Sequence, residues 1–222
     1  MGTGTFGRVC LCRDKVTSQY LAMKILAISD VIRLKQIEHV KNEKNILRLV
    51  THPFIIDMYW HYRDDRFLYM LFEYVCGGEL FAYLRNAGKF PMTTGILIYE
   101  MLAGYPPFFD DNPFGIYEKI LGGRVEWPRH LDAAAKDLIK KLLTQDRTKR
   151  LGNMKNGADD VKRHRFFKNI DWEDVYQKKL KPPIVPKVNY EGDTRNFDDY
   201  PENNWRSTQG VSDIELAIFN DF

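Results

Sequence analysis

The first residues that could do chemistry form a glycine-rich segment, GTGTFGRV, which spans Gly2 to Val9. It fits the pattern GxGxxGxV, in which glycines let backbone N–H groups approach phosphate oxygens without a Cβ in the way. Taken alone, the pattern favours a plain glycine-rich hairpin over a phosphate site. Its context favours the phosphate site, because a second β-rich run follows the segment, whereas a dinucleotide-binding loop leads from a strand into a helix. Glycines between two strands are typical of a lid over nucleotide phosphates.

A lysine and a glutamate further along the chain could complete such a site. Lys24 lies in the apolar run LAMKIL, and Glu43 lies three residues after Val40 and four before Leu47. In a helix Glu43 therefore shares the inward face of its apolar neighbours. A glutamate on such a face needs a cationic partner, and Lys24 is the natural candidate. The alternatives are a strand-edge lysine with its ammonium in solvent and a glutamate at the rim of the core, but the order of the three pieces favours an ion pair.

The elements that must position these residues are β-rich first and helical later. Residues 1–26 predict strand, turn and strand, and residues 54–62 and 66–75 predict a hairpin. Between them, residues 30–50 predict one helix with Asp30 as its cap. The tail from Tyr176 onward shows little periodicity, and its prolines favour an extended chain.

Further helices are expected in the second half of the chain. The run Ile96–Ala103 is almost wholly apolar, so we expect it to be buried on all sides. Residues 132–146 show a clear amphipathic pattern with Asp132 as the cap. The remaining expected helices are a short one ending at Gly88, one at 113–122 and one at 159–168.

Composition excludes several classes of protein. The chain has 222 residues, of which 44% are hydrophobic and 14% aromatic, and this composition is typical of a folded globular protein. Its net charge of +3 is too small to indicate binding to nucleic acid or to an anionic membrane. No apolar run approaches the roughly 18 residues of a membrane span, and we expect no signal peptide. The cysteines at 10, 12 and 76 show no disulfide spacing, which favours a reducing, intracellular setting.

Taken in order, these pieces resemble the AGC family of serine/threonine protein kinases, and in particular the catalytic subunits of cyclic-AMP-dependent protein kinase. Two stretches, PPFFDDNPFGIYEKIL and KLKPPIVPK, are still more similar to the protein kinase X branch of that family. The other stretches that carry the resemblance are GTGTFGRV, LAMK, IEHVKNEKNIL, LYMLFEYVCGGELF, LIYEMLAGYPPFF, DRTKRLGN, DTRNFDDY and the terminal FNDF. The resemblance covers essentially the whole chain.

The resemblance implies an α+β fold with the two lobes of a protein kinase. Residues 1–75 would form a β-rich N-lobe with an incomplete first strand, and residues 76–175 an incomplete helical C-lobe. Residues 176–222 would form the C-terminal tail of the family. Within that tail, Phe219 and Phe222 resemble a hydrophobic motif that docks on the N-lobe, and Ser207 or Thr208 lies near a phosphorylation position.

The resemblance also implies a role for each matching residue. Lys24 would hold the α- and β-phosphates of ATP, and Glu43 would brace it. Glu79 would contact the ribose and a basic residue of the substrate, and Glu100 a substrate arginine. Phe72 stands at the gatekeeper position. The other residues implied to contact the nucleotide are Gly2, Gly4, Gly7, Val9, Ala22, Glu73, Val75, Phe197 and Tyr200.

The segment that carries catalysis in protein kinases is missing. Such an enzyme needs H/Y-R-D-x-x-x-x-N, then D-F-G, then A-P-E, which together occupy on the order of eighty residues after the helix ending near Gly88. Seven residues separate Gly88 from Ile96, and none of the three motifs is present, so residues 89–96 read as a junction. The letters of His61–Asp64 resemble the first motif, but Tyr69 stands where the asparagine should be, and we interpret this stretch as a turn. The acidic pairs Asp110–Asp111 and Asp198–Asp199 lack a base at useful spacing.

By family, the function would be phosphorylation of serine or threonine near basic residues, with ATP and Mg²⁺ as cofactors. Basic peptide substrates or inhibitors and cyclic-AMP regulatory subunits would be the partners, and the location would be the cytoplasm or the nucleus. Because the general base and the protein ligands of the metal are missing, we expect no metal site and a catalytically inactive chain. The alternatives are a pseudokinase-like module that binds ATP or a partner, and an unstable product of splicing or gene decay.

Overall fold

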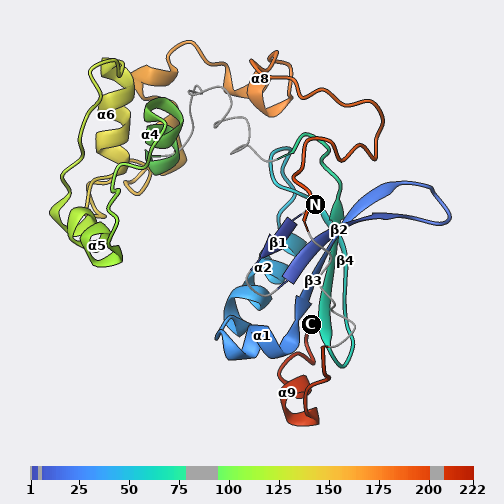
Figure 1. Ribbon diagram of the computed structural model, residues 1–222. Helices are drawn as coiled ribbons and strands as arrows, with labels where there is room; N and C mark the ends of the chain where they lie inside the picture. Colours follow the sequence, from blue (N-terminus) through green and yellow to red (C-terminus); the bar gives the residue numbers. More distant parts are fainter. Residues whose placement is uncertain (1, 5–6, 79–94, 201–207) are drawn as a thin grey trace. The chain divides into compact units, whose positions relative to one another are not determined.

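The fold contains both helices and antiparallel strands, as the sequence predicts. The computed structural model describes residues 2–4, 7–78, 95–200 and 208–222. It divides into two compact units (Figure 1), of which the first combines Met1–Glu79 with Lys181–Phe222 and the second is Leu80–Leu180. The end of the tail therefore belongs to the same unit as the N-terminal sheet. The division at 75 and 175 stays a prediction about the domains.

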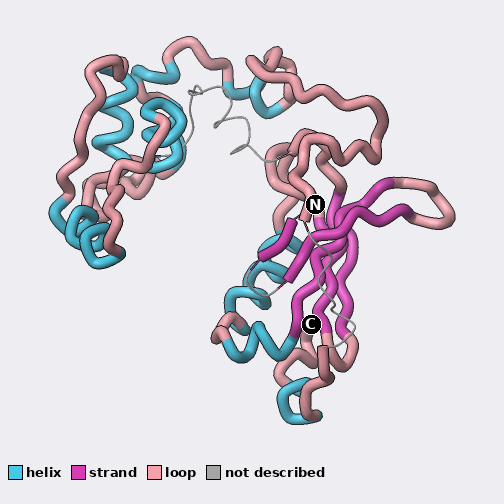
Figure 2. The backbone as a smooth tube through the Cα atoms, in the orientation of Figure 1, coloured by secondary structure: helices cyan, strands magenta, loops and turns pink. Residues whose placement is uncertain are grey.

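The first unit is built on a five-stranded antiparallel sheet with the strand order β1-β2-β3-β5-β4 (Figure 2). Strands β3 and β5 lie inside the sheet, and their residues are the most buried. Strand β4 lies at the edge, where a register shift between Met58 and Trp60 interrupts its pairing with β5. The strands are β1 (Gly2–Gly4), β2 (Gly7–Arg13), β3 (Tyr20–Ala27), β4 (Met58–Arg63) and β5 (Phe67–Glu73).

The register of the two inner strands places Lys24 on an otherwise apolar face. Successive residues of a strand point to opposite faces, so Ala22, Lys24 and Leu26 share one face. The facing pairs are Ala22 with Phe72, Lys24 with Met70 and Leu26 with Leu68. All of these residues except Lys24 belong to the hydrophobic core of this unit.

The prediction of a single helix over residues 30–50 was wrong. The chain forms α1 (Ile28–Arg33) and α2 (Ile37–Leu49) instead. Lys35 has a φ of 55°, and the N–H of Gln36 bonds to the carbonyl of Val31 at 2.8 Å, which is the closing bond of a Schellman turn. Asp30 is not a cap, because it lies inside the first turn of α1 and pairs with Arg33 at 2.6 Å.

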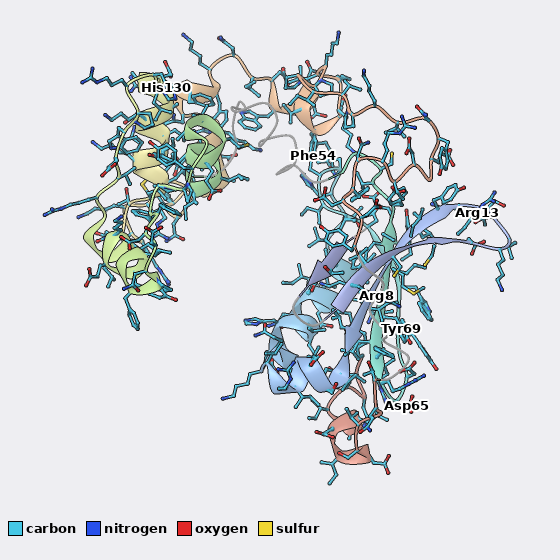
Figure 3. All side chains as sticks on the ribbon, viewed as in Figure 1. Arg8, Arg13, Phe54, Asp65, Tyr69 and His130 are labelled. Atoms are coloured by element: carbon cyan, nitrogen blue, oxygen red, sulfur yellow. The ribbon has the colours of Figure 1, made fainter. Side chains whose placement is uncertain are left out.

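The last residues of the tail complete the core between the sheet and α2. Phe219 is fully buried and Phe222 nearly so, which confirms that the C-terminal motif docks on the N-terminal sheet and helix. The preceding helix α9 (Asp213–Ala217) begins with a capping box made by Ser212 and Glu215. The tail is also tied to the β4–β5 turn, where the N–H of Val211 donates to the carbonyl of Asp65 at 3.1 Å (Figure 3).

A buried lysine on α2 holds the end of the tail. The side chain of Lys44 is 2% exposed, and its ammonium donates to the carbonyl of Asp221. The same ammonium lies 5.1 Å from the centre of the Phe222 ring, in cation–π geometry. Burial lowers the pKa of Lys44, and the nearby carboxylate of Asp221 partly opposes that shift. Lys41, one turn earlier, pairs with the Asp221 carboxylate at 2.8 Å.

The second unit is helical, and its core joins α4 to α6. Asp132 caps α6 by accepting hydrogen bonds from the N–H groups of Ala134 and Ala135, as predicted. The expectation that Ile96–Ala103 is buried on all sides was wrong at Ile96, which is 48% exposed. The elements are α4 (Gly95–Ala103), α5 (Pro113–Gly122), α6 (Ala133–Leu142), α7 (Ala158–Lys162), η1 (Arg165–Phe167) and α8 (Trp172–Tyr176). Of the helices in the described ranges, none has the length and apolar character needed to cross a bilayer.

The buried Phe219 ring should be a main source of stability for the first unit. Phe219→Ala leaves a cavity between the sheet and α2, and such a change typically costs about 3–5 kcal/mol. Chemical denaturation followed by far-UV circular dichroism measures the loss. The matched control is Ile214→Ala on α9, where the side chain is 83% exposed and the change should be small. An equal effect of the two variants would contradict the docking of the tail.

Candidate functional site

The candidate site centres on an ion pair between β3 and α2. The ammonium of Lys24 lies 2.7 Å from both carboxylate oxygens of Glu43. The pair forms because the strand turns Lys24 toward the core face, while the helical period turns Glu43 toward the sheet beside Val40. The predicted ion pair is therefore present in the structure.

This ion pair contributes little to stability. The side chains of Lys24 and Glu43 are 25% and 37% exposed, respectively. Partly exposed ion pairs are screened by water and typically contribute about 0.2–1 kcal/mol. Two apolar side chains at these positions would pack equally well, so packing alone does not require the two charges. The geometry therefore indicates that the pair positions an ammonium group rather than stabilises the fold.

The glycine-rich segment forms a hairpin beside this ion pair. A cavity of about 420 Å³ is lined by residues of β1 and β2 and by Lys24 and Leu26 of β3. Arg8 also borders this cavity, but it lies between Gly7 and Val9 on β2, so its side chain points to the opposite face of the sheet from Lys24. The cavity therefore combines backbone groups with the ammonium of Lys24, a combination that suits a phosphate group.

The three glycines differ in what the protein itself requires of them. A Cβ at Gly7 would lie 2.4 Å from the carbonyl oxygen of Ile25, so the sheet itself needs glycine at that position. A Cβ at Gly2 would meet nothing within 4 Å, and one at Gly4 only a carbonyl oxygen at 3.8 Å. Since no contact in the described residues demands glycine at positions 2 and 4, these glycines leave the backbone open to a ligand.

The other predicted nucleotide contacts of the first unit lie around β2, β3 and β5. Val9 and Ala22 share the core face with Lys24, as the strand register requires. Phe72, at the predicted gatekeeper position, is buried in the same core. Glu73 ends β5, and Val75 follows it with 57% of its surface exposed.

Two predicted residues come from the tail. The ring of Phe197 lies 6.0 Å from that of Tyr74, which follows β5 directly. This contact brings the tail to the segment that contains Val75. Tyr200 is half-buried. The structure thus gathers the predicted residues of the sheet, α2 and the tail into one compact unit.

Two predicted residues lie outside the described part of the first unit. Glu79 lies outside the described residues. Glu100 lies on α4, in the other compact unit, and is half-buried there. The assignment of both residues to substrate binding therefore stays a prediction.

Sequence reasoning missed the residues that attach the tail. The hydroxyl of Tyr74 donates to the carbonyl of Asp193 at 2.6 Å, and Asn196 Nδ2 donates to the carbonyl of Cys76 at 3.0 Å. These contacts join residues more than one hundred positions apart, so no local pattern reveals them. The only sequence signal is the DTRNFDDY stretch itself, which contains both Asp193 and Asn196.

Two of the acidic residues considered as substitutes, Asp64 and Asp110, have structural roles. Asp64 accepts hydrogen bonds from the N–H groups of Arg66 and Phe67 and from the hydroxyl of Tyr69, which confirms its interpretation as a turn residue. The Tyr69 pKa rises to about 12, mainly through burial and then through this bond. Asp110 pairs with Lys119 at 3.0 Å. Within the described ranges, no three His, Cys, Asp or Glu residues are grouped so that they could hold a metal ion.

Comparison with known proteins links the chain to protein kinases. A family model described as the protein kinase domain matches residues 1–94. The chain is 51% identical to cAMP-dependent protein kinase catalytic subunit 3 of Drosophila melanogaster, over all of this chain and 52% of that protein. It is 46% identical to cAMP-dependent protein kinase catalytic subunit PRKX of Homo sapiens, over all of this chain and 85% of that protein. The chain thus spans about half the length of the fly relative and most of the human one.

The lengths of these matches reveal a gap. Both run over 304 aligned positions, whereas the chain has 222 residues. At least 82 positions of each relative, the difference between these two numbers, therefore stand opposite no residue of this chain. The kinase-domain match also ends at residue 94, and α4 begins at Gly95.

Removing the charge of Glu43 should change stability by no more than about 1 kcal/mol, because the ion pair is partly exposed. Urea denaturation of Glu43→Gln measures the change. The control is Glu38→Gln, an exposed position on the same helix. A loss of several kcal/mol in Glu43→Gln alone would show that the pair is a structural element instead.

Proposed function

Because the chain belongs to the family of cAMP-dependent protein kinase catalytic subunits, we propose that it binds ATP without transferring its phosphate. The observation that carries this proposal is the pair of Lys24 and Glu43 beside the glycine hairpin. An ammonium group held at 2.7 Å by a carboxylate, on a cavity with open backbone, suits the phosphates of a nucleotide. The proposal separates binding from catalysis, since each depends on different residues.

The residues present fit ATP at its phosphate end. Lys24 would hold the α- and β-phosphates, and Glu43 would keep the ammonium turned toward them. Gly2, Gly4 and Gly7 would offer backbone N–H groups from above, while Val9 and Ala22 would cover the adenine. Bound ATP would supply the phosphoryl group that family enzymes transfer. The site is completed by the proposed contacts of four further residues with the nucleotide: Glu73, Val75, Phe197 and Tyr200.

The residues that would use the nucleotide are missing from the sequence. No H/Y-R-D-x-x-x-x-N, D-F-G or A-P-E motif occurs in the 222 residues. The gap of at least 82 aligned positions supports the loss of a segment that the relatives contain. The end of the kinase-domain match at residue 94 supports a junction near 89–96.

The missing residues should reduce the rate of phosphoryl transfer by a large factor. A positioned general base contributes roughly 10²–10⁴ in rate. Metal ions at the transferring phosphate add several kcal/mol, and about 1.36 kcal/mol is tenfold. Phosphoryl transfer depends almost entirely on positioning and electrostatics, so Lys24 and Glu43 do not compensate for both losses. Mg²⁺ that arrives with ATP would be held by its phosphates and water, since the family's protein ligands are absent from the sequence.

The proposed partners follow from the family. Glu79 and Glu100 would contact basic peptides, as substrates in an active relative or as inhibitors here. A cyclic-AMP regulatory subunit is a second proposed partner, and the cytoplasm or nucleus is the proposed location. We propose no role in binding nucleic acid or membranes.

A second candidate is an unstable product, and the second unit favours it. Large apolar side chains are widely exposed there, including Ile96, Phe109 and Phe114. Each large apolar side chain left uncovered forgoes about 1.5–3 kcal/mol. A two-dimensional amide NMR spectrum distinguishes the candidates, because an unstable product gives narrowly dispersed signals for residues 95–180.

Nucleotide binding should be visible as stabilisation. ATP at about 100 times its dissociation constant should add ~2.7 kcal/mol to the free energy of unfolding. A thermal shift series with ATP measures this, with calorimetry as a second readout. Lys24→Met should remove the shift, whereas Lys15→Met, in the exposed turn between β2 and β3, should keep it. The absence of a shift in the unchanged chain sinks the proposal.

Phosphoryl transfer should stay at background. The measurement is incorporation of radiolabelled phosphate from ATP into an arginine-rich peptide. The loss of the base alone predicts a rate reduced by roughly 10²–10⁴. Transfer at an ordinary kinase rate that disappears in Lys24→Met would overturn the proposed inactivity, because it would place the activity in this chain rather than in a contaminant.

A further inference from the structure

A histidine of β4 lies against the last residue of the tail. The ring centres of His61 and Phe222 are 5.8 Å apart, and the ring planes meet at 80°. This is the edge-to-face geometry that aromatic rings favour. His61 stands opposite Met70 of β5, so it shares the core face on which Phe222 is buried. A titratable ring therefore belongs to the surface against which the end of the tail packs.

One nitrogen of this ring has no place for a proton. Nδ1 of His61 is buried and has no hydrogen-bond partner in the part of the chain that the structure describes. In a neutral imidazole one nitrogen carries no proton, whereas in the cation both nitrogens are N–H donors. A buried charged donor without an acceptor costs more free energy than a buried neutral acceptor. The surroundings of His61 therefore favour the neutral ring.

The charges on the neighbouring helix also disfavour a protonated ring. Helix α2 packs against β4 and brings Lys44 and Arg48 toward His61. Burial is the main cause that lowers the pKa of His61, and these two cations lower it further. A hydrogen bond from the ring to the backbone of Phe222 partly opposes the shift. The docked tail thus lies beside a histidine that is harder to protonate than one in solvent.

The other charged groups at this place keep their charge at mildly acidic pH. The tail contributes the carboxylate of Asp221, which pairs with Lys41 of α2 at 2.8 Å. That pairing holds the pKa of Asp221 below its usual range. On β4, the guanidinium of Arg63 donates to the side-chain oxygen of Asn220 at 2.7 Å. Of these charged groups, His61 alone changes its charge between about pH 5 and 7.

We propose that His61 makes the docking of the tail end dependent on pH. The tail end stays docked while the ring is neutral, and protonation of the ring promotes its release from α2 and the sheet. The proposal goes beyond nucleotide binding and does not rest on it, because every contact that carries it lies within the protein.

The sign of the shift sets the pH range. A histidine in solvent has a pKa near 6.5, and docking of the tail lowers the pKa of His61. The undocked state therefore binds the proton more readily, and docking weakens as the pH falls below about 6.5. At about pH 5.5, one unit lower, one such group shifts the docking equilibrium by at most about tenfold. Above about pH 7.5 its effect on docking is small.

Hydrogen exchange of the full chain tests the proposal. Mass spectrometry follows the amides of residues 211–222 at about pH 7.5 and 5.5, with rates corrected for the intrinsic effect of pH on exchange. We expect protection of these amides to fall by roughly three- to tenfold at the lower pH. Amides of β3 and β5 should keep their protection, which separates release of the tail end from global unfolding.

Variants of His61 show whether the histidine is responsible. His61→Gln and His61→Leu cannot gain a proton in this range, so both should lose the fall in protection while keeping the protection of the unchanged chain at pH 7.5. The matched control is His39→Gln, which removes an exposed histidine of α2 and should keep the full pH dependence. The leucine variant keeps the test valid if the amide of glutamine itself disturbs docking.

An NMR titration of the histidine ring protons gives a second readout. The signal of His61, assigned by its loss in His61→Gln, should titrate below pH 6.5. A titration at or above that value would overturn the proposal, because docking would then not disfavour the protonated ring. The same conclusion follows if His61→Gln and His61→Leu lose protection at pH 5.5 as the unchanged chain does, or if the unchanged chain loses none.

Discussion

The candidate site depends on the placement of one ammonium group on an otherwise apolar face. Lys24 has Ala22 and Leu26 on either side of it along that face of β3, and both are buried. A charge at such a position needs either water or a partner, and α2 supplies a partner by directing Glu43 at the sheet. The site therefore requires three features to be compatible. These are the rotation of α2 about its axis, the register of β3 with β5, and the hairpin of β1 and β2.

The tail contributes to this agreement at two places. Its end fills the space between α2 and the sheet with Phe219 and Phe222, and Asn196 bonds to Cys76 in the chain that follows β5. The sheet alone would leave a core face open at one end and an unsupported chain at the other. Residues far apart in the sequence thus form one compact unit, Met1–Glu79 with Lys181–Phe222.

Much of the site and part of the fold outside it could be predicted from the sequence, because their signals are local or periodic. The glycine spacing, the lysine in a β run, the helical phase of Glu43 and the cap at Asp132 need only neighbours in the chain. The break between α1 and α2 could not be predicted, because it depends on Lys35 adopting a positive φ that its residue type does not favour. The attachment of Asn196 to Cys76 was equally hidden, since it depends on tertiary contact. The burial of Ile96 was predicted wrongly, because an apolar run shows that its side chains would be more stable when buried. It does not show whether another part of the protein packs against them.

The side chains of two adjacent residues of α2 point in different directions. Consecutive side chains on an α-helix are separated by about 100° around its axis. Glu43 faces the strand that carries Lys24, while Lys44 faces Asp221 and the ring of Phe222. A helix pinned by neighbouring residues on two sides cannot roll without breaking both attachments. The contacts of Asp221 and Phe222 with α2 therefore oppose rotation of the helix, and the direction in which the Glu43 carboxylate points depends in part on these two residues.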